Sequence, residues 1–259
     1  MTEESLSGKV VVITGGAGGL GRALSREFSK SGSTVVLLDK NESRLAEAAA
    51  ELSAGGPLPY SAVVNIGRRA EVAEAMEKIV AKFGRVDVLI NNAAVCQSKP
   101  MFELTEEDWD DVMDVNVKGV FFAIQSAAPH MPSGGAVLNI ASVAGRLGRP
   151  TLLHYAASKA AVISITRSAA VELSERGVRV NAIAPGMIDT DMFHQLQQSW
   201  QARGEGERSP SAQPSFKSTL LGRPAKPSEI ASVALFLCSD AASYVTGQTL
   251  NACGGIVMS

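Results

Sequence analysis

The chain has 259 residues, of which 46% are hydrophobic and 19% charged, and its formal net charge is -2. So small a charge, without a long run of one sign, argues against nucleic acid or a charged membrane surface as a partner. The length fits one α/β domain with a substantial core. The N-terminus lacks the pattern of a secretory signal, and no apolar run approaches the ~20 residues of a membrane-spanning helix. We therefore expect a cytoplasmic protein.

The cysteines and histidines show no metal-binding or disulfide pattern. The three cysteines have neither CxxC spacing nor an even number, so we expect reduced thiols that pack as small apolar residues. The three histidines are scattered along the chain without ligand spacing, so we expect no metal site. These residues are Cys96, Cys238, Cys253, His130, His154 and His194.

Short apolar runs alternate with stretches of helical spacing along the chain. Continuous apolar runs are typical of strands buried on both faces of a parallel sheet. The predicted strands are Val10–Thr14, Thr34–Asp39, Ala62–Ile66, Val86–Asn91, Ala136–Ala141 and Val178–Ile183, with a short edge strand at Gln248–Asn251. The predicted helices are Arg22–Ser31, Ser43–Ser53, Ala70–Phe83, Glu106–Met131, Tyr155–Arg176 and Pro227–Cys238. This alternation predicts a doubly wound α/β fold with right-handed crossovers.

One polar, turn-rich stretch, Asp191–Ser218, interrupts this pattern. A helix resumes at Pro227, so we interpret residues 1–259 as a single domain and this stretch as a substrate lid within it. A surface loop without a role is the alternative. Within the stretch, Met192–Trp200 has the spacing of a short helix. The candidates for the inner face are the apolar Met187, Met192, Phe193 and Leu196, or the polar Gln195, Gln197 and Gln198.

A glycine-rich turn lies between the first predicted strand and the first predicted helix. Gly15, Gly19 and Gly21 follow the spacing TGxxxGxG. Glycines there permit a tight turn and a close approach of the backbone to a pyrophosphate. The free amide groups and the positive dipole of the helix start would then face the phosphates. The position after the first strand favours a dinucleotide site over an ordinary tight turn.

The second predicted strand ends at Asp39, close to the ~20-residue spacing expected of an acid that binds the adenosine ribose. A carboxylate at this place accepts hydrogen bonds from the ribose hydroxyls and repels a 2′-phosphate. Lys40 follows directly and could instead pair with such a phosphate. We therefore predict NAD as the cofactor, with NADP as the less favoured alternative.

Six motifs occur together in one order. They are TGGAGGLG, NNAA, DVNVKG with Asn116, NIASVAG with Ser142, YAASK with Tyr155 and Lys159, and NAIAPG. In this combination the chain resembles the short-chain dehydrogenase/reductase family over nearly its whole length. The resemblance implies a Rossmann fold with a parallel seven-stranded sheet, and a homotetramer.

The residues themselves explain the chemistry. Tyr155 and Lys159 are four positions apart, which places both on one face of a helix. A neighbouring ammonium would lower the pKa of Tyr155, which could then exchange a proton with a substrate oxygen, while Ser142 holds that oxygen by a hydrogen bond. The resemblance adds that Lys159 binds the nicotinamide ribose and that Asn116 anchors a water chain that relays the proton. Ser158 is interpreted as a small packing residue.

The resemblance also implies the other contacts of a bound dinucleotide. Asn91, with the two alanines after Asn92, resembles the family segment beside the adenosine. Asn65 stands where an aspartate often touches the adenine, and its amide oxygen could accept the same hydrogen bond. The predicted cofactor-binding residues are Gly15, Gly19, Leu20, Gly21, Asp39, Asn65, Ile66, Asn92, Ala93, Tyr155, Lys159, Pro185, Gly186, Ile188 and Thr190.

These features predict an NAD-dependent oxidoreductase that interconverts a small secondary alcohol and a ketone by direct hydride transfer. A polyol or sugar alcohol is the first substrate hypothesis, because YAASKAAVISITRSA and GGIVMS are similar to bacterial sorbitol-type dehydrogenases. A 3-oxoacyl-thioester or small-ketone reductase is the enzymatic alternative. A non-catalytic NAD-binding regulatory protein is a further alternative, against which the complete set of Asn116, Ser142, Tyr155 and Lys159 argues.

Overall fold

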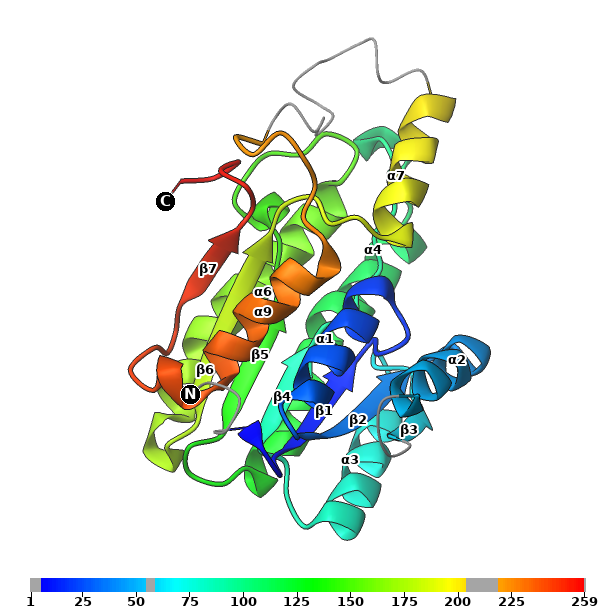
Figure 1. Cartoon of the computed structure of the whole chain (residues 1–259). Helices are drawn as coiled ribbons and strands as arrows, with labels where there is room; N and C mark the ends of the chain where they lie inside the picture. Colours follow the sequence, from blue (N-terminus) through cyan, green and yellow to red (C-terminus); the bar gives the residue numbers. More distant parts are fainter. Residues whose placement is uncertain (1–5, 55–58, 204–218, 259) are drawn as a thin grey trace.

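The computed structural model describes residues 6–54, 59–203 and 219–258. The strands of these residues form one sheet in the order β3-β2-β1-β4-β5-β6-β7, and every neighbouring pair is parallel. Figure 1 shows this sheet with helices on both faces. The strands are β1 (Val10–Thr14), β2 (Thr34–Asp39), β3 (Tyr60–Val63), β4 (Val88–Asn91), β5 (Ala136–Ile140), β6 (Arg179–Pro185) and β7 (Thr249–Ala252). The predicted doubly wound, single-domain architecture is confirmed for the described residues.

Two hydrophobic cores lie on the two faces of the sheet. One packs the sheet against α1 (Gly19–Lys30), α2 (Glu42–Ser53) and α9 (Pro227–Cys238). The other packs it against α3 (Arg69–Phe83), α5 (Gly119–Ala127) and α6 (Leu153–Glu172). Two shorter helices, α4 (Glu106–Met113) and α7 (Asp191–Ala202), complete the α-helices of the described chain.

Strand β1 shows why the apolar runs are continuous. All five of its residues are buried. Because successive side chains of a strand point to opposite faces, Val10 and Val12 enter one core while Val11 and Ile13 enter the other. Both faces therefore demand apolar side chains, and alternation with polar residues disappears.

The strand order reverses at β1, because β2 and β3 lie on one side of it and β4 to β7 on the other. In open α/β sheets a ligand crevice forms outside the carboxyl ends of the strands at such a reversal. Here β1, β4 and β5 end at Thr14, Asn91 and Ile140. The segments that follow these residues contain the motifs noted in the sequence.

Some predicted boundaries were wrong. Strand β3 occupies Tyr60–Val63, two residues earlier than expected, and its exposure alternates because it lies at the sheet edge. The Asn65 side chain accepts a hydrogen bond from the Gly67 amide (3.1 Å), which forms a turn where the strand was expected to continue. Helix α1 begins at Gly19 and not at Arg22, so it starts inside the glycine-rich turn.

The expected helix Glu106–Met131 is also divided. A π-helical turn at Asp114–Lys118 separates α4 from α5, and a 3-10 turn, Ala128–His130, ends the segment. Single π turns inside helices often mark functional sites, and this one contains the fully buried Asn116. Helix α6 likewise ends at Glu172, four residues before the predicted Arg176. None of the described helices combines the length and apolar character needed to span a membrane.

Candidate active site

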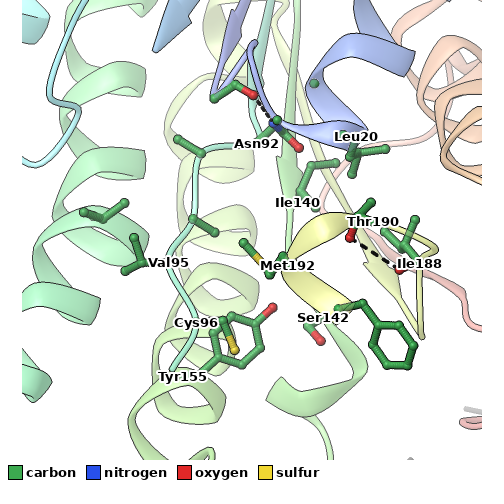
Figure 2. A pocket seen from close by; sticks show the side chains of 18 of the residues that line it. Leu20, Asn92, Val95, Cys96, Ile140, Ser142, Tyr155, Ile188, Thr190 and Met192 are labelled. Atoms are coloured by element: carbon green, nitrogen blue, oxygen red, sulfur yellow. Dashed lines mark hydrogen bonds between the residues drawn. The ribbon is translucent and has the colours of Figure 1, made fainter. Parts of the chain in front are cut away.

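A cavity of about 600 Å³ lies at the carboxyl edge of the sheet. Its walls come from the segments after each of the strands β1 to β6, from α6 and from α7. Every catalytic or cofactor-binding residue expected from the sequence lines this cavity except Asn116. Figure 2 shows Ser142 and Tyr155 on its lower wall and Leu20, Asn92 and Thr190 above them. Residues from five separate motifs therefore meet in one space.

The glycine-rich turn leaves no room for side chains at two positions. Gly15 has φ of 64°, a conformation that favours glycine, and a Cβ there would lie 2.7 Å from the Ala93 Cα. A Cβ on Gly21 would collide with the Gly15 carbonyl oxygen. These contacts bring the start of α1 close to the ends of β1 and β4.

The start of α1 fits a phosphate group. Gly18 is its N-cap and supplies no side-chain oxygen to the helix amides. The first amides of a helix have no intrahelical acceptor, and the helix dipole adds partial positive charge there. Gly18, Gly19 and Leu20 line the cavity. The backbone therefore offers a cradle of the kind that binds a pyrophosphate.

Asp39 is held at the end of β2 by two backbone amides. Its carboxylate accepts a hydrogen bond from the Ala17 amide at 3.1 Å and one from the Asn41 amide at 3.0 Å. The side chain of Asn41 in turn caps α2 by accepting from the Arg44 amide (3.0 Å). The carboxylate is thus fixed on the cavity wall, half-buried, with further lone pairs for a ligand.

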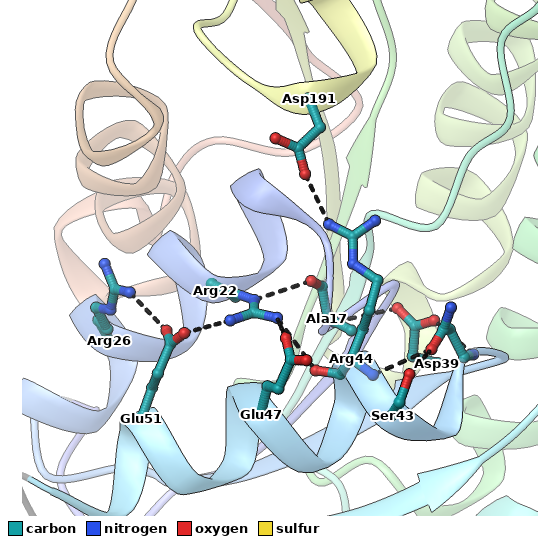
Figure 3. Close-up of polar contacts among 10 residues, drawn as sticks. Ala17, Arg22, Arg26, Asp39, Ser43, Arg44, Glu47, Glu51 and Asp191 are labelled. Atoms are coloured by element: carbon teal, nitrogen blue, oxygen red, sulfur yellow. Dashed lines mark hydrogen bonds and ion pairs between the residues drawn. The ribbon is translucent and has the colours of Figure 1, made fainter. Parts of the chain in front are cut away.

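An ion pair joins the two sides of the cavity mouth. The Arg44 guanidinium at the start of α2 lies 2.9 Å from the Asp191 carboxylate at the start of α7 (Figure 3). The Arg44 carbonyl accepts a hydrogen bond from Arg22, whose guanidinium also pairs with Glu47 and Glu51. Both Arg44 and Asp191 line the cavity. Arg44 was not expected at the cavity, because nothing in the sequence around it indicates a partner so distant in the chain.

The two asparagines at the end of β4 have different roles. Asn92 lines the cavity and its side-chain amide donates to the carbonyls of Thr14 (3.0 Å) and Gly15 (2.9 Å), which ties β4 to the glycine-rich turn. Asn91 is buried, donates to the side chain of Asn139 on β5 (2.8 Å) and does not line the cavity, whereas Ala93 and Ala94 of the same expected segment do. Asn65, expected to meet the adenine, lines the cavity, and its side-chain oxygen accepts a hydrogen bond from the Gly67 amide.

Ser142, Tyr155 and Lys159 meet at the other end of the cavity. Ser142 follows β5 and its hydroxyl accepts from the Ala144 amide at 3.1 Å. The Lys159 ammonium is buried, lies 5.7 Å from the centroid of the Tyr155 ring and donates to the Ile140 carbonyl at 2.7 Å. The strand end and the first turns of α6 thus place the three polar groups on one wall.

The pKa values differ from the sequence-based expectation. Burial raises the pKa of Tyr155 above its ordinary value, and a hydrogen bond with Ser142 only partly opposes this effect. Burial also lowers the pKa of Lys159 to about 8. The expected lowering of the Tyr155 pKa by Lys159 was therefore wrong for the protein alone, because desolvation of the phenolate dominates. The phenol stays neutral and keeps its proton.

Asn116 lies behind the cavity wall. Its side-chain oxygen accepts from the Val95 amide (2.8 Å), and its nitrogen donates to the Val95 carbonyl (2.9 Å) and to the Ser158 hydroxyl (3.0 Å). Ser158 donates in turn to the Tyr155 carbonyl at 2.7 Å. Ser158 therefore connects the π turn to the helical turn that carries Tyr155, a link that its interpretation as simple packing missed.

The space beside Tyr155 is apolar. Leu152, Met187, Phe193 and Trp200 form a buried cluster that Leu196, Ile256, Cys96 and Tyr155 itself contact. Cys96 lies beside Tyr155 (Figure 2), and burial raises the pKa of its thiol to about 12.

Helix α7 supplies much of this apolar wall. The expected helix Met192–Trp200 is confirmed within Asp191–Ala202, whereas residues 204–218 of the expected lid lie outside the described residues. Of the candidates for its inner face, Met187, Phe193 and Leu196 belong to the apolar cluster or contact it. Met192 also lines the cavity, although it is 37% exposed. Trp200 was missed. Of the three glutamines, only Gln195 lines the cavity. Within the described part of the chain, no group of three histidine, cysteine or acidic side chains is placed to hold a metal ion.

Comparison with known proteins assigns the chain to a family. The family model described as enoyl-(acyl carrier protein) reductase matches residues 15–257. A 3-oxoacyl-(acyl-carrier-protein) reductase of Thermotoga maritima is 43% identical over 257 residues, which cover 98% of this chain and 99% of that protein.

Solved structures agree with this assignment. A short-chain dehydrogenase/reductase of Brucella melitensis, described as a glucose/ribitol dehydrogenase, has a TM-score of 0.88 and 34% identity, covering 98% of this chain and 99% of that chain. A 3-ketoacyl-(acyl-carrier-protein) reductase from the same organism, in complex with NADH, has a TM-score of 0.85 and 32% identity, with 98% and 100% covered. A blue fluorescent protein from a metagenomic library, in complex with NADPH, has a TM-score of 0.87 and 33% identity, again with 98% and 100% covered. The chain therefore belongs to the short-chain dehydrogenase/reductase family of nicotinamide-dependent oxidoreductases.

Proposed function

We propose that this protein reduces a 3-oxoacyl thioester to the 3-hydroxyacyl thioester with a reduced nicotinamide cofactor. The apolar cluster beside Tyr155 is the observation that carries the proposal. Leu152, Phe193 and Trp200 offer surface for an acyl chain. A polyol would bring hydroxyl groups that lose their water and find few partners there. The name of the Thermotoga relative supports the same choice. The alternative in the sequence analysis is therefore preferred to its first hypothesis, a polyol.

The chain's own residues provide the proton chemistry of this reduction. The bound cofactor supplies a hydride to the substrate carbonyl carbon. The neutral Tyr155 phenol donates its proton to the carbonyl oxygen as negative charge develops there. The Ser142 hydroxyl accepts a hydrogen bond from the Ala144 amide and also bonds with Tyr155, and with substrate present it would donate its hydrogen to that oxygen. Lys159, which lines the cavity, would hold the nicotinamide ribose, and Asn116 acts through Ser158 and the backbone to position Tyr155.

For the cofactor, we propose a preference for NADH over NADPH. The carboxylate of Asp39 is fixed by the amides of Ala17 and Asn41 on the wall where a dinucleotide places its adenosine ribose. A phosphate added to that ribose would meet this negative charge. Lys40 and Arg44 line the same region and weaken the discrimination, but Arg44 is already paired with Asp191. The glycine cradle of α1 would hold the pyrophosphate of either cofactor.

We also propose that α7 serves as the lid over the substrate. Phe193 and Trp200 are only 7% and 4% exposed because they pack with Leu152 and Met187 in the apolar cluster. Their position excludes water from the space beside Tyr155, which strengthens the electrostatic contacts there. The homotetramer implied by the family resemblance stays a prediction, and the large exposed apolar side chains of Phe121 on α5 and Val171 on α6 support it.

A substrate panel tests the proposed reaction. We expect kcat/KM for 3-oxoacyl thioesters to exceed that for polyol oxidation. Within the thioester series, kcat/KM should rise about fourfold with each added methylene until the apolar cluster is filled, since a buried methylene contributes ~0.8 kcal/mol. The decrease in NADH absorbance during the reaction gives the rates. Faster turnover of polyols, or rates independent of chain length, would contradict the proposal.

A further inference from the structure

We propose that Arg149 binds an anionic group of the substrate, so that this protein selects carbonyl substrates that carry negative charge. The inference rests on the proposed reduction beside Tyr155 and adds the chemical class that the cavity recognises. The ligand group is a set of anionic oxygens, in the form of a carboxylate or a phosphate.

Arg149 belongs to the loop that joins the two catalytic segments. This loop runs from the 3-10 turn Val143–Gly145, which follows Ser142, to the start of α6. Arg149 lines the cavity, and its carbonyl accepts a hydrogen bond from the Leu152 amide at 3.2 Å. Leu152 is a member of the apolar cluster beside Tyr155. Arg149 therefore lies near the substrate end of the cavity and not in the glycine-rich end.

Arg149 has no acidic partner among the described residues. It is half-buried, and burial lowers the pKa of its guanidinium with no opposing effect from a nearby carboxylate. Other arginines at the cavity or next to it differ, since Arg44 pairs with Asp191 and Arg22 with Glu47. A cation that is partly removed from water without a partner lowers stability, and an anionic ligand offsets this cost.

The acids that line the described part of the cavity cannot fill this role. They are Asp39, which accepts from the amides of Ala17 and Asn41 at the glycine-rich end, and Asp191, which pairs with Arg44. At the substrate end, Arg149 and Lys159 are the lining side chains that carry a charge at neutral pH, and both are cationic. A neutral polyol or ketone would leave the Arg149 charge uncompensated.

The loop that carries Arg149 is held in one conformation. Thr151 is the only described non-glycine residue with positive φ, at 61°. Its hydroxyl accepts from Ser98 at 2.9 Å and its carbonyl accepts from the Lys99 amide at 2.7 Å. Such a backbone conformation costs free energy and persists where surrounding contacts impose it, commonly at ligand sites. The two bonds restrain the backbone of the loop two residues from Arg149.

Two sources could supply the anionic oxygens, because a guanidinium binds carboxylate and phosphate in the same bidentate way. The first is the phosphate on the pantetheine arm of a thioester. The second is the carboxylate of a free oxo acid. Each source has a neutral counterpart of nearly the same shape, so charge can be tested separately from size.

The experiment uses the whole protein with NAD present. Dissociation constants are measured by calorimetry for two pairs of ligands, 4′-phosphopantetheine against pantetheine and acetoacetate against methyl acetoacetate. In each pair only the first carries the anionic group. The variants are Arg149→Gln, which removes the charge, and Arg149→Lys, which keeps it. Arg26→Gln is the matched control, because Arg26 pairs with Glu51 on the surface and does not line the cavity.

We expect the unmodified protein to bind the anionic member of one pair about 10- to 100-fold more tightly than the neutral member, the range of a charge-assisted hydrogen bond. Arg149→Gln should abolish that difference, Arg149→Lys should restore part of it, and Arg26→Gln should leave it unchanged. A preference within the phosphate pair identifies the arm as the source, and one within the acetoacetate pair identifies the carboxylate. If neither pair shows a preference, or if Arg149→Gln weakens neutral and anionic ligands equally, the proposal is wrong. Binding is measured without turnover, so this result stands apart from the fate of the proposed reaction.

Discussion

Replacing Tyr155 with phenylalanine removes one oxygen atom and tests the proton donor directly. The ring would keep its contacts with the apolar cluster and with Lys159. The hydroxyl is the group whose pKa is raised by burial, so at neutral pH it carries the proton that a ketone reduction requires. We expect the variant to fold and to bind cofactor like the unmodified protein.

The expected loss of rate follows from the absence of a substitute donor. General acid catalysis contributes about 10²- to 10⁴-fold, which corresponds to roughly 3 to 5 kcal/mol of activation free energy. Cys96 lies beside Tyr155, but burial raises the pKa of its thiol to about 12, so it is a weak acid. The Lys159 ammonium donates to the Ile140 carbonyl on the strand side. We therefore expect kcat to fall at least about 100-fold.

Single-turnover kinetics with saturating NADH and a 3-oxoacyl thioester measure this loss. Tyr60→Phe is the matched control, because Tyr60 on β3 packs edge-on against Phe83 on α3 and does not line the cavity. It should leave kcat unchanged. A Tyr155→Phe variant that keeps its melting temperature and cofactor affinity but also retains more than about a tenth of the rate would refute the assignment of Tyr155 as the proton donor.

Two further predictions concern the cofactor. Asp39→Asn keeps an oxygen for the Ala17 amide but removes the negative charge, so the preference for NADH over NADPH should narrow by about tenfold in fluorescence titrations; tighter binding of NADPH by the unmodified protein would show that Lys40 and Arg44 decide the choice. Burial lowers the pKa of Lys159 to about 8, so its ammonium is present below that pH and is lost as the pH rises through it. Affinity for NADH should therefore fall as the pH is raised above about 8. An affinity that does not change with pH, as expected for a Lys159→Met variant, would contradict a contact between the Lys159 ammonium and the cofactor.

The sequence predicted most of the fold because a two-sided parallel sheet imposes local patterns. The bounds of β1 and β2 were predicted residue by residue, since burial on both faces produces an uninterrupted apolar run with clear ends. The π turn at Asp114–Lys118 was not predicted. It depends on the Asn116 side chain bonding to the backbone of Val95, and that contact exists only once the segment after β4 has reached the helix.

The candidate site, like the fold, was predicted only where the pattern is local in the sequence. Tyr155 and Lys159 could be placed together from spacing alone, because four residues make about one helical turn. By itself the sequence therefore determined the family motifs, the glycine-rich turn and the placement of Tyr155 and Lys159 on one helix face. Tertiary structure alone decided that Arg44 pairs with Asp191, that Arg149 has no acidic partner in the described chain, and that burial outweighs Lys159 in its effect on the Tyr155 pKa. Charge pairing and desolvation depend on which segments meet in space, and segments far apart in the chain meet only after the sheet has formed.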